Sequence, residues 1–308
     1  MTRYVAKRVA YLLVTLFVIA SITFFISKLL PGTPFADDKL TPQIRAQLFA
    51  KYGLDEPLPV QYVKYMLNVA QGDLGNSFYF ENRPVTQMIL QGLPISMFVG
   101  VQAVVFGFVV GLVLGIVAAL RHNTLWDTAA VVVAVVGVSV PTFVLGPLLQ
   151  YWLGVKLGLF PIAFFESWMH SVLPSLALSV FVISTVARFI RSEMLEVMGQ
   201  DYITLATAKG LTGLAVIVRH VLRNSLIPLV TVVAPLTVYI ITGSLVVEQI
   251  FAVPGIGEQF VTSVFVSDYS MILGTTLFFS VMFILALLIQ DILYGIIDPR
   301  IRVSGAKE

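Results

Sequence analysis

The chain contains none of the short motifs that place reactive side chains in common enzyme classes. It has no G-x-S-x-G, no H-E-x-x-H, no P-loop G-x-x-x-x-G-K-[ST] and no C-x-x-C. Its histidines, His122, His170 and His220, lie far apart, and without cysteine there is neither a disulfide framework nor a thiol metal site. We therefore assign no catalytic residue, no metal and no bound cofactor. Any ATP-driven role would need an ATPase from another chain.

The residue pattern that best suggests a specific task lies between 192 and 223. Asp201 can cap the start of a helix, Gly210 supplies a left-handed turn that ends it, and Thr212 can begin the next turn. The short side chains at 206–208 let another surface approach closely. The pattern predicts a helix, a glycine break and a second helix. Because any helical hairpin can contain such residues, the spacing alone leaves docking and plain structure equally open.

The composition places this hairpin on a membrane protein. Of the 308 residues, 58% are hydrophobic and 12% are charged, whereas soluble domains contain about 25% charged residues. About 20 apolar residues form one helix that crosses a bilayer. Six such runs predict an all-α polytopic membrane fold with six transmembrane helices: 9–27, 84–120, 128–155, 167–187, 224–247 and 269–290.

Two of these runs need interpretation. The run 84–120 is long enough for two spans, but Pro84, Gly92 and Pro94 suit a turn that leads into one helix near 94–120. The first run follows three basic residues and therefore resembles a secretory signal peptide. Its length and the lack of a clear small-x-small cleavage site favour a retained helix.

Basic residues near the predicted helix ends set the orientation. Cytoplasmic loops carry an excess of Lys and Arg. With the N-terminus inside, Arg121, the basic residues of 188–223 and those of the tail all fall inside, whereas 248–270 has no Lys or Arg and falls outside. Both termini are therefore expected in the cytoplasm. The net charge of +2 is spread along the chain and gives no sign of nucleic-acid binding.

A long segment, 31–93, follows the first span, and its composition predicts a small folded cap outside the membrane. Thr41 as N-cap and Gly53 after the last turn frame one short helix. A second helix between positions 59 and 72 would carry on one face Val60, Val63 and Leu67.

The second span has one small residue at every fourth position, so that one stripe of the helix lets a neighbouring backbone approach closely. Glycine is common in membrane helices, but the strict register favours a tight helix packing seam. The stripe consists of Ala103, Gly107, Gly111, Gly115 and Ala119.

The middles of the six spans contain no Asp, Glu, Lys or Arg. Gradient-driven transporters usually keep ionisable groups there or contain paired broken helices in two repeated halves. These marks are absent or weak, which disfavours a secondary transporter or channel. The polar groups available, Gln102, Gln150 and Gln290, suit a solute route or interhelical hydrogen bonds, and for any single one we favour the hydrogen bonds.

The hairpin resembles the coupling loop of ABC importer permeases, whose general pattern is E-A-A-x-x-x-G. Here the pattern is T-L-A-x-x-x-G over 204–210, with Arg223 in place of the usual downstream proline. The form typical of peptide importers, D-Y-x-x-x-A-x-A-K-G followed by R-H-x-L-R-N, matches 201–210 and 219–224. Further stretches resemble that subfamily and spread the resemblance over most of the chain: 52–62, 72–77, 139–143 and 247–257.

This resemblance implies a type I ABC importer permease fold and the first of the two paired permeases of oligopeptide and dipeptide importers. It implies these partners in a bacterial cell membrane: a second homologous permease, two ABC ATPase subunits that bind ATP and Mg²⁺, an extracytoplasmic peptide-binding protein, and membrane lipid. The coupling residues would be Asp201, Tyr202, Thr204, Ala206, Ala208, Lys209 and Gly210. The expected division is a first transmembrane helix 1–30, an extracytoplasmic segment 31–93, a permease core 94–298 with the coupling loop 192–223, and a cytoplasmic tail 299–308.

Two matters stay open in the sequence. The turn after the fifth span either lies near the binding protein or outer gate, or is an ordinary turn; its residues are Glu248, Pro254, Gly255 and Gly257. Related permeases carry nickel or glutathione instead of peptides, and the binding protein sets most of that choice.

Overall fold

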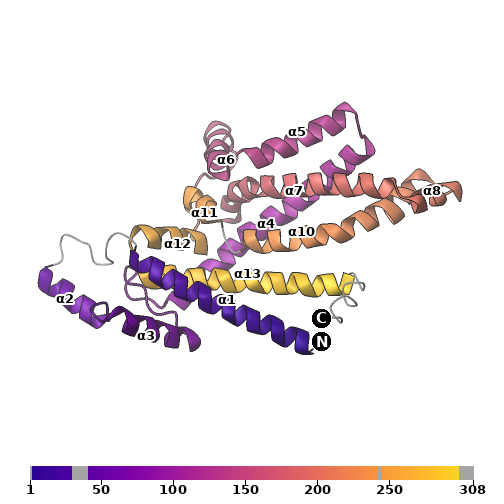
Figure 1. Ribbon diagram of the computed structural model, residues 1–308. Helices are drawn as coiled ribbons and strands as arrows, with labels where there is room; N and C mark the ends of the chain where they lie inside the picture. Colours follow the sequence, from indigo (N-terminus) through magenta and orange to yellow (C-terminus); the bar gives the residue numbers. More distant parts are fainter. Residues whose placement is uncertain (1, 30–40, 242–243, 298–308) are drawn as a thin grey trace. The chain divides into compact units, whose positions relative to one another are not determined.

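The computed structural model describes the backbone of residues 2–29, 41–241 and 244–297, and the side chains of 10–29, 41–241 and 244–288 (Figure 1). These residues contain no β-strand, only one isolated bridge between Asn76 and Pro84. The long helices are α1 (Thr2–Leu29), α4 (Val85–Leu120), α5 (Leu125–Ser139), α7 (Val172–Met198), α10 (Arg223–Ile241) and α13 (Tyr269–Ile297). The short ones are α2 (Pro42–Lys51), α3 (Leu58–Ala70), α6 (Thr142–Leu149), α8 (Asp201–Ala208), α9 (Gly213–Val216), α11 (Leu245–Phe251) and α12 (Ile256–Phe265). Two stretches are π-helical, Gln150–Lys156 and Ile217–Leu222.

Among the described residues, five helical segments are long and apolar enough to cross a membrane: Ala10–Leu29, Val85–Leu120, Trp168–Met198, Gly213–Ile241 and Tyr269–Leu288. A sixth results if Leu125–Ser139 and Thr142–Lys156, which are bent by 103° at the break between them, count as one span. The all-α polytopic fold predicted from the apolar runs is confirmed.

The second span begins earlier than predicted. We expected a turn before position 94, but α4 starts at Val85 and contains Pro94 within the helix. A proline removes one helical hydrogen bond, and membrane helices tolerate this loss where the surrounding structure compensates for it. Gly92 serves close packing instead of a turn, because a Cβ added there would lie 2.9 Å from the backbone nitrogen of Ile256.

The third predicted span, 128–155, is not one straight helix. Val140 has an extended backbone, with ψ 115°, and it precedes Pro141. Proline disfavours the α conformation in the residue before it. Helix α5 therefore ends at Ser139, and α6 starts in a new direction at Thr142.

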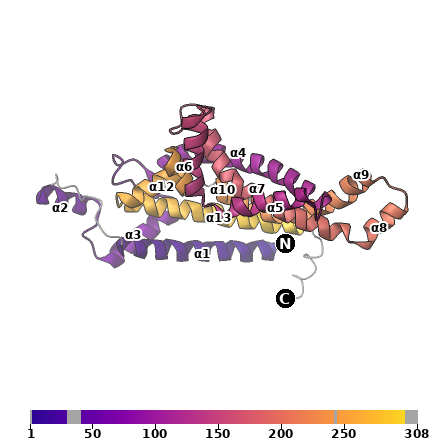
Figure 2. The same ribbon diagram turned by 90° about the horizontal axis from the view of Figure 1, so that it is seen from above.

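The chain forms two compact units. The first contains the described residues up to Ile95 together with Pro254–Leu285, and the second contains Ser96–Val253 and the described residues from Ala286 onward. In Figure 2 the first unit includes α1, α2, α3 and α12, and the second includes α5 to α10.

The first unit has a core where the starts of α4, α12 and α13 meet, formed by Val85, Met88, Ile89, Ile256 and Met271. Beside it, the fully buried Asp268 carboxylate accepts hydrogen bonds from the Ser77 hydroxyl at 2.5 Å and the Phe78 amide at 3.2 Å. It also accepts one from the Met271 amide at 3.3 Å, in the first turn of α13. Asp268 thus fixes the loop after α3 to the start of α13.

The two short helices predicted in segment 31–93 are present. The Thr41 hydroxyl accepts a hydrogen bond from the Ile44 amide at 3.3 Å and so caps α2, and Gly53 has a left-handed φ of 64° after its end. Helix α3 begins at Leu58, one residue before the predicted start. Residues 30–40 lie outside the described part of the chain.

The second unit is organised around the seam between α4 and α7. A Cβ added at Gly107 would lie 2.5 Å from Val182 Cβ, one at Gly111 would lie 2.8 Å from Ile183 O, and one at Gly115 would lie 2.6 Å from Ala187 O. Real Cβ atoms essentially never approach other heavy atoms within 3.0 Å. The glycine stripe of α4 therefore lies directly against α7.

The seam makes Gly111→Leu a sharp test of the fold. The added side chain has no space beside the α7 backbone, and overpacking of this kind costs about 1–3 kcal/mol or more. We expect a lower melting temperature of the purified protein in detergent and a lower yield of folded protein. Val113→Leu, at an exposed position of the same helix, is the matched control and should melt like the wild type. Equal melting temperatures for both variants would contradict the seam.

Candidate functional site

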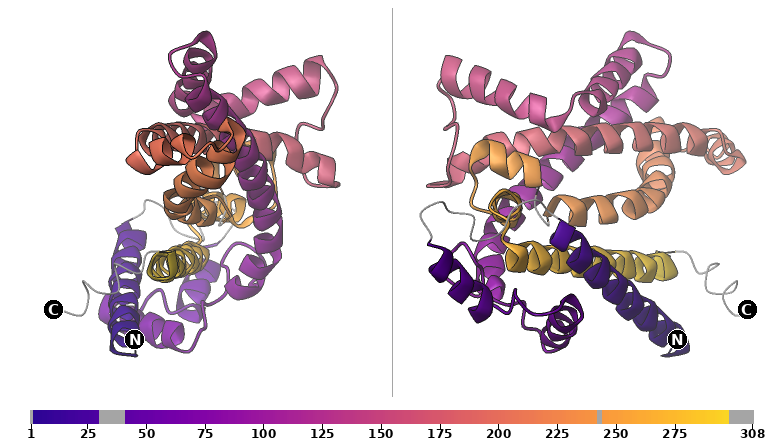
Figure 3. Two further views of the ribbon diagram at one scale, coloured as in Figure 1. Left: turned by 90° about the vertical axis from the view of Figure 1, so that its right-hand side faces the viewer. Right: turned by 60° about the vertical axis from the view of Figure 1, so that its left-hand side comes forward.

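The predicted hairpin lies between α7 and α10 in the second unit and extends past the end of α7 (Figure 3). Helix α8 is followed by Gly210, whose left-handed φ of 85° ends the helix as predicted. The Thr212 hydroxyl accepts a hydrogen bond from the Ala215 amide at 3.4 Å and starts α9. One detail of the prediction was wrong: Gln200 is the N-cap of α8, and Asp201 is its first helical residue. There the Asp201 carboxylate interacts favourably with the helix dipole.

The two faces of α8 differ in exposure. Ile203 and Ala206 are each only 7% exposed and face the chain itself. The other predicted coupling residues are exposed: Asp201, Tyr202, Thr204, Ala208, Lys209 and Gly210. Ala206 therefore cannot be the contact through which another protein docks, because its small side chain is already buried within this chain.

The hairpin also exposes apolar side chains that the sequence pattern did not single out. They are Leu205 on α8, Leu211 in the turn and Leu214 on α9, the last of which is 73% exposed. Clustered exposed apolar residues of this kind mark protein or membrane contacts. The sequence alone does not identify these leucines as exposed, because it does not show which face of the hairpin packs against the rest of the chain.

One hydrogen bond connects the two halves of the sequence pattern. The Asn224 side-chain amide donates to the Tyr202 hydroxyl at 3.1 Å. Tyr202 lies in the first turn of α8, and Asn224 lies in the first turn of α10. The bond ties the hairpin to the base of a predicted membrane span.

A buried ion pair lies near the end of α7 that carries the hairpin, and the sequence reasoning missed it. Arg191 Nε lies 2.6 Å from Asp127 Oδ1, and Arg191 Nη2 lies 2.9 Å from Oδ2. Asp127 is only 4% exposed. The Asn123 amide and His122 Nδ1 each lie 3.0 Å from the same carboxylate, at Oδ2. The sequence pattern indicates only a topology role for Arg191 and shows no partner for His122.

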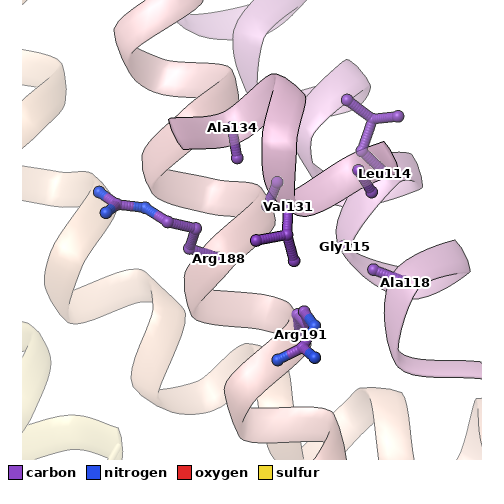
Figure 4. Close-up of a pocket in the computed structure, with 9 residues that line it drawn as sticks. Leu114, Gly115, Ala118, Val131, Ala134, Arg188 and Arg191 are labelled. Carbon is purple, nitrogen blue, oxygen red and sulfur yellow. The ribbon is translucent and has the colours of Figure 1, made fainter. Parts of the chain in front are cut away.

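The ion pair holds the turn between α4 and α5 against α7. A small cavity lies beside it among α4, α5 and α7, lined by small residues such as Gly115, Ala118 and Ala134 and by the stems of Arg188 and Arg191 (Figure 4). No signal in a single sequence pairs Asp127 with a residue 64 positions away.

Two of the predicted intramembrane glutamines act as hydrogen-bonding links. Gln102 Oε1 on α4 accepts hydrogen bonds from the hydroxyls of Ser171, at 2.7 Å, and Ser175, at 3.0 Å. The Gln150 amide donates to the backbone oxygens of Ile162 at 2.7 Å and Ile250 at 3.1 Å. The interhelical role that we favoured is confirmed for both, whereas the Gln290 side chain lies outside the described residues.

The residues predicted for an outer gate or binding-protein contact differ in their exposure at the surface. Glu248, in α11, is only 1% exposed. In the other unit Pro254 is exposed, whereas Gly255 and Gly257 are buried at the start of α12. Of these four residues, only Pro254 offers a surface for contact with another molecule.

Two family profiles match this chain. Residues 111–303 match the family described as binding-protein-dependent transport system inner membrane component, and residues 1–100 match the N-terminal part of the corresponding membrane component. The chain belongs to this family of binding-protein-dependent transport permeases. The permease is 44% identical over 303 residues to the dipeptide transport system permease protein DppB of Lactococcus lactis, with 98% of this chain and 100% of the relative covered. It is 36% identical over 305 residues to the oligopeptide transport system permease protein OppB of Salmonella typhimurium, with 98% and 100% covered.

The fold of the permease is that of ABC importer permeases. It resembles a chain of the inward-facing MetNI methionine ABC transporter with a TM-score of 0.57 and 17% identity, covering 69% of this chain and 97% of that one. It resembles a chain of an amino acid ABC transporter with a TM-score of 0.52 and 16% identity, covering 70% and 94%. The permease is therefore a multi-pass membrane protein with a known transporter architecture.

The ion pair yields a second prediction. Asp127 is buried, whereas the Arg191 side chain is 26% exposed, so removing the aspartate leaves a partly solvated arginine and costs about 1.5–3 kcal/mol of lost charged hydrogen bonds. We expect Asp127→Ala to lower the stability of the purified permease by that amount. The double variant Asp127→Ala/Arg191→Ala should be less destabilised than the sum of the two single variants, as measured by thermal unfolding in detergent. Additive losses would show that the two side chains do not interact.

Proposed function

We propose that the permease is one of two paired pore-forming subunits of an ATP-driven importer for dipeptides or oligopeptides. The observation that carries this proposal is its similarity, over 98% of its length, to permeases named for dipeptide and oligopeptide transport. In this proposal an extracytoplasmic binding protein delivers the peptide, a second homologous permease completes the pore, and two ABC ATPases supply the energy. ATP and Mg²⁺ would bind to the ATPases, since this sequence has no P-loop.

We infer that the hairpin is the surface on which an ATPase subunit docks. Its apolar side chains Leu205, Leu211 and Leu214 are exposed, and its inner residues Ile203 and Ala206 keep its shape. Closure of the two ATPases on ATP would push the hairpin. Because the hairpin continues from α7 and is tied to α10 by the bond between Tyr202 and Asn224, the push would tilt these two helices. The pore would then change the side to which it opens.

The cargo is the least constrained part of this proposal. A nickel or glutathione importer of the same family is the second candidate, because the binding protein sets most of the choice. A gradient-driven transporter is a weaker candidate, because such transporters usually keep ionisable groups in the middle of a span. Among the described residues, Asp127 is a carboxylate paired with an arginine, but it lies in the first turn of α5 and not in the middle of a span.

Partner identification tests this proposal. The tagged permease, purified in mild detergent, should bring down two P-loop ATPases and a second permease, identified by mass spectrometry. Leu214→Glu should reduce the recovered ATPase about tenfold or more, because it places an unpaired carboxylate in an apolar contact. Leu125→Glu, at an apolar side chain that is also exposed but is the first residue of α5, should reduce it little. A permease that purifies alone would favour a gradient-driven transporter.

The proposed orientation has its own test. The permease has no cysteine, and both Asn76 and Gly213 are exposed. With the termini in the cytoplasm, an impermeant maleimide should label Asn76→Cys in intact cells and should label Gly213→Cys only after the membrane is opened. The reverse pattern would overturn the topology.

A further inference from the structure

Helix α3, in the first unit, packs one side against the end of α1. Phe24 stacks on Tyr65 with ring centroids 5.4 Å apart, and Phe25 stacks on Tyr62 at 5.3 Å. The hydroxyls of Ser21 and Tyr62 lie 2.7 Å apart, within hydrogen-bond distance. Burial and the neighbouring Tyr62 raise the pKa of Tyr65 to about 12. This side of α3 is therefore an aromatic contact with α1, in which Tyr62 and Tyr65 are half-buried.

The opposite side of α3 is apolar and uncovered. Val60, Val63 and Leu67 are 42%, 54% and 56% exposed. At about 100° per residue they fall within roughly 60° of one another, on the side of the helix away from Tyr62 and Tyr65. A helix in a water-soluble cap would not be expected to have apolar residues on both of these sides.

Polar residues occupy only one narrow edge of α3. That edge is formed by Gln61, Lys64 and Asn68, and Lys64 and Asn68 are exposed. The Lys64 ammonium donates to the Glu56 carboxylate at 2.7 Å. A helix with one polar edge and a broad apolar remainder is typical of helices that lie in the plane of a membrane interface.

The depth of α3 follows from where it touches α1. Its contacts reach from Ser21 to Lys28, whose ammonium donates to Gln61 Oε1 at 2.7 Å. The described apolar segment of α1 runs to Leu29, so at 1.5 Å per residue these contacts cover about its last 12 Å. Figures 1 and 2 show α3 beside the Leu29 end of α1. Lysine and tyrosine gather near the edge of the hydrocarbon core, and Lys28, one residue before Leu29, lies at that end of the segment.

We propose that α3 lies in the membrane interface at the Leu29 end of α1, with Val60, Val63 and Leu67 in contact with lipid acyl chains. Apolar side chains are also exposed on the same end of α1, among them Ile22, Ile26 and Leu29. In the proposed orientation this is the extracytoplasmic leaflet. The predicted cap, segment 31–93, would then be bound to lipid through α3, and this contact would fix its height above the membrane.

Spin-label accessibility in vesicles tests this proposal in the assembled importer, with partner cysteines replaced by serine. Labels are attached to Val63→Cys and Leu67→Cys, and to Lys64→Cys and Asn68→Cys as matched controls one residue away on the polar edge. Lipid contact predicts several-fold higher relaxation by oxygen than by a water-soluble nickel chelate at 63 and 67, and the reverse at 64 and 68.

Two outcomes would overturn the proposal. High nickel accessibility at 63 and 67 would make α3 a water-exposed cap. Low accessibility to both reagents at these positions would mean that a protein partner covers the face. Uptake by the labelled complexes is measured in parallel, so that failure of the importer assignment and failure of the lipid contact are told apart.

Discussion

The close contact between α4 and α7 is the constraint on which the second unit depends. Between apolar helices in lipid there is little hydrophobic driving force, so association relies on close packing and hydrogen bonds. Gly107, Gly111 and Gly115 provide that packing by admitting the α7 backbone to distances that no other side chain would allow. Gln102 adds hydrogen bonds to Ser171 and Ser175 near the start of α7. The position of α7 is thereby set along its length, and the hairpin that it carries is set with it.

The two units are held by different contacts. Near the hairpin, the pair of Asp127 and Arg191 joins the turn after α4 to α7. A push on the hairpin would then move these elements together. It would also reach α10, because α9 runs through the π-helical stretch Ile217–Leu222 into α10 and Tyr202 is hydrogen-bonded to Asn224. In the other unit, Asp268 fixes a loop to the start of α13 and α3 lies beside α1. These contacts fit an element that keeps its place at a membrane surface.

Much of the fold could be predicted because membrane helices follow from local composition. The apolar runs, the glycine stripe, the Thr41 cap and the left-handed Gly210 all act within one or two turns. The predictions that failed concern residues whose roles depend on tertiary contacts. Gly92 suggested a turn but serves close packing, Ala206 suggested an outward surface but faces inward, and Asp127 gained its role from an arginine 64 residues away. In the third apolar run, Pro141 marks a local break that the sequence contains, but the 103° angle at that break depends on tertiary packing.

If an ATPase sits on the exposed face of α8, a cross-linker on that face should capture it. A photoactivatable maleimide is attached to Leu205→Cys in membranes that contain the complete importer, with Ile203→Cys, on the buried face of the same helix, as control. We expect an ATPase adduct from position 205 that changes in yield when ATP is added, and little adduct from position 203. No ATPase adduct from 205, or equal adducts from both positions, would contradict it.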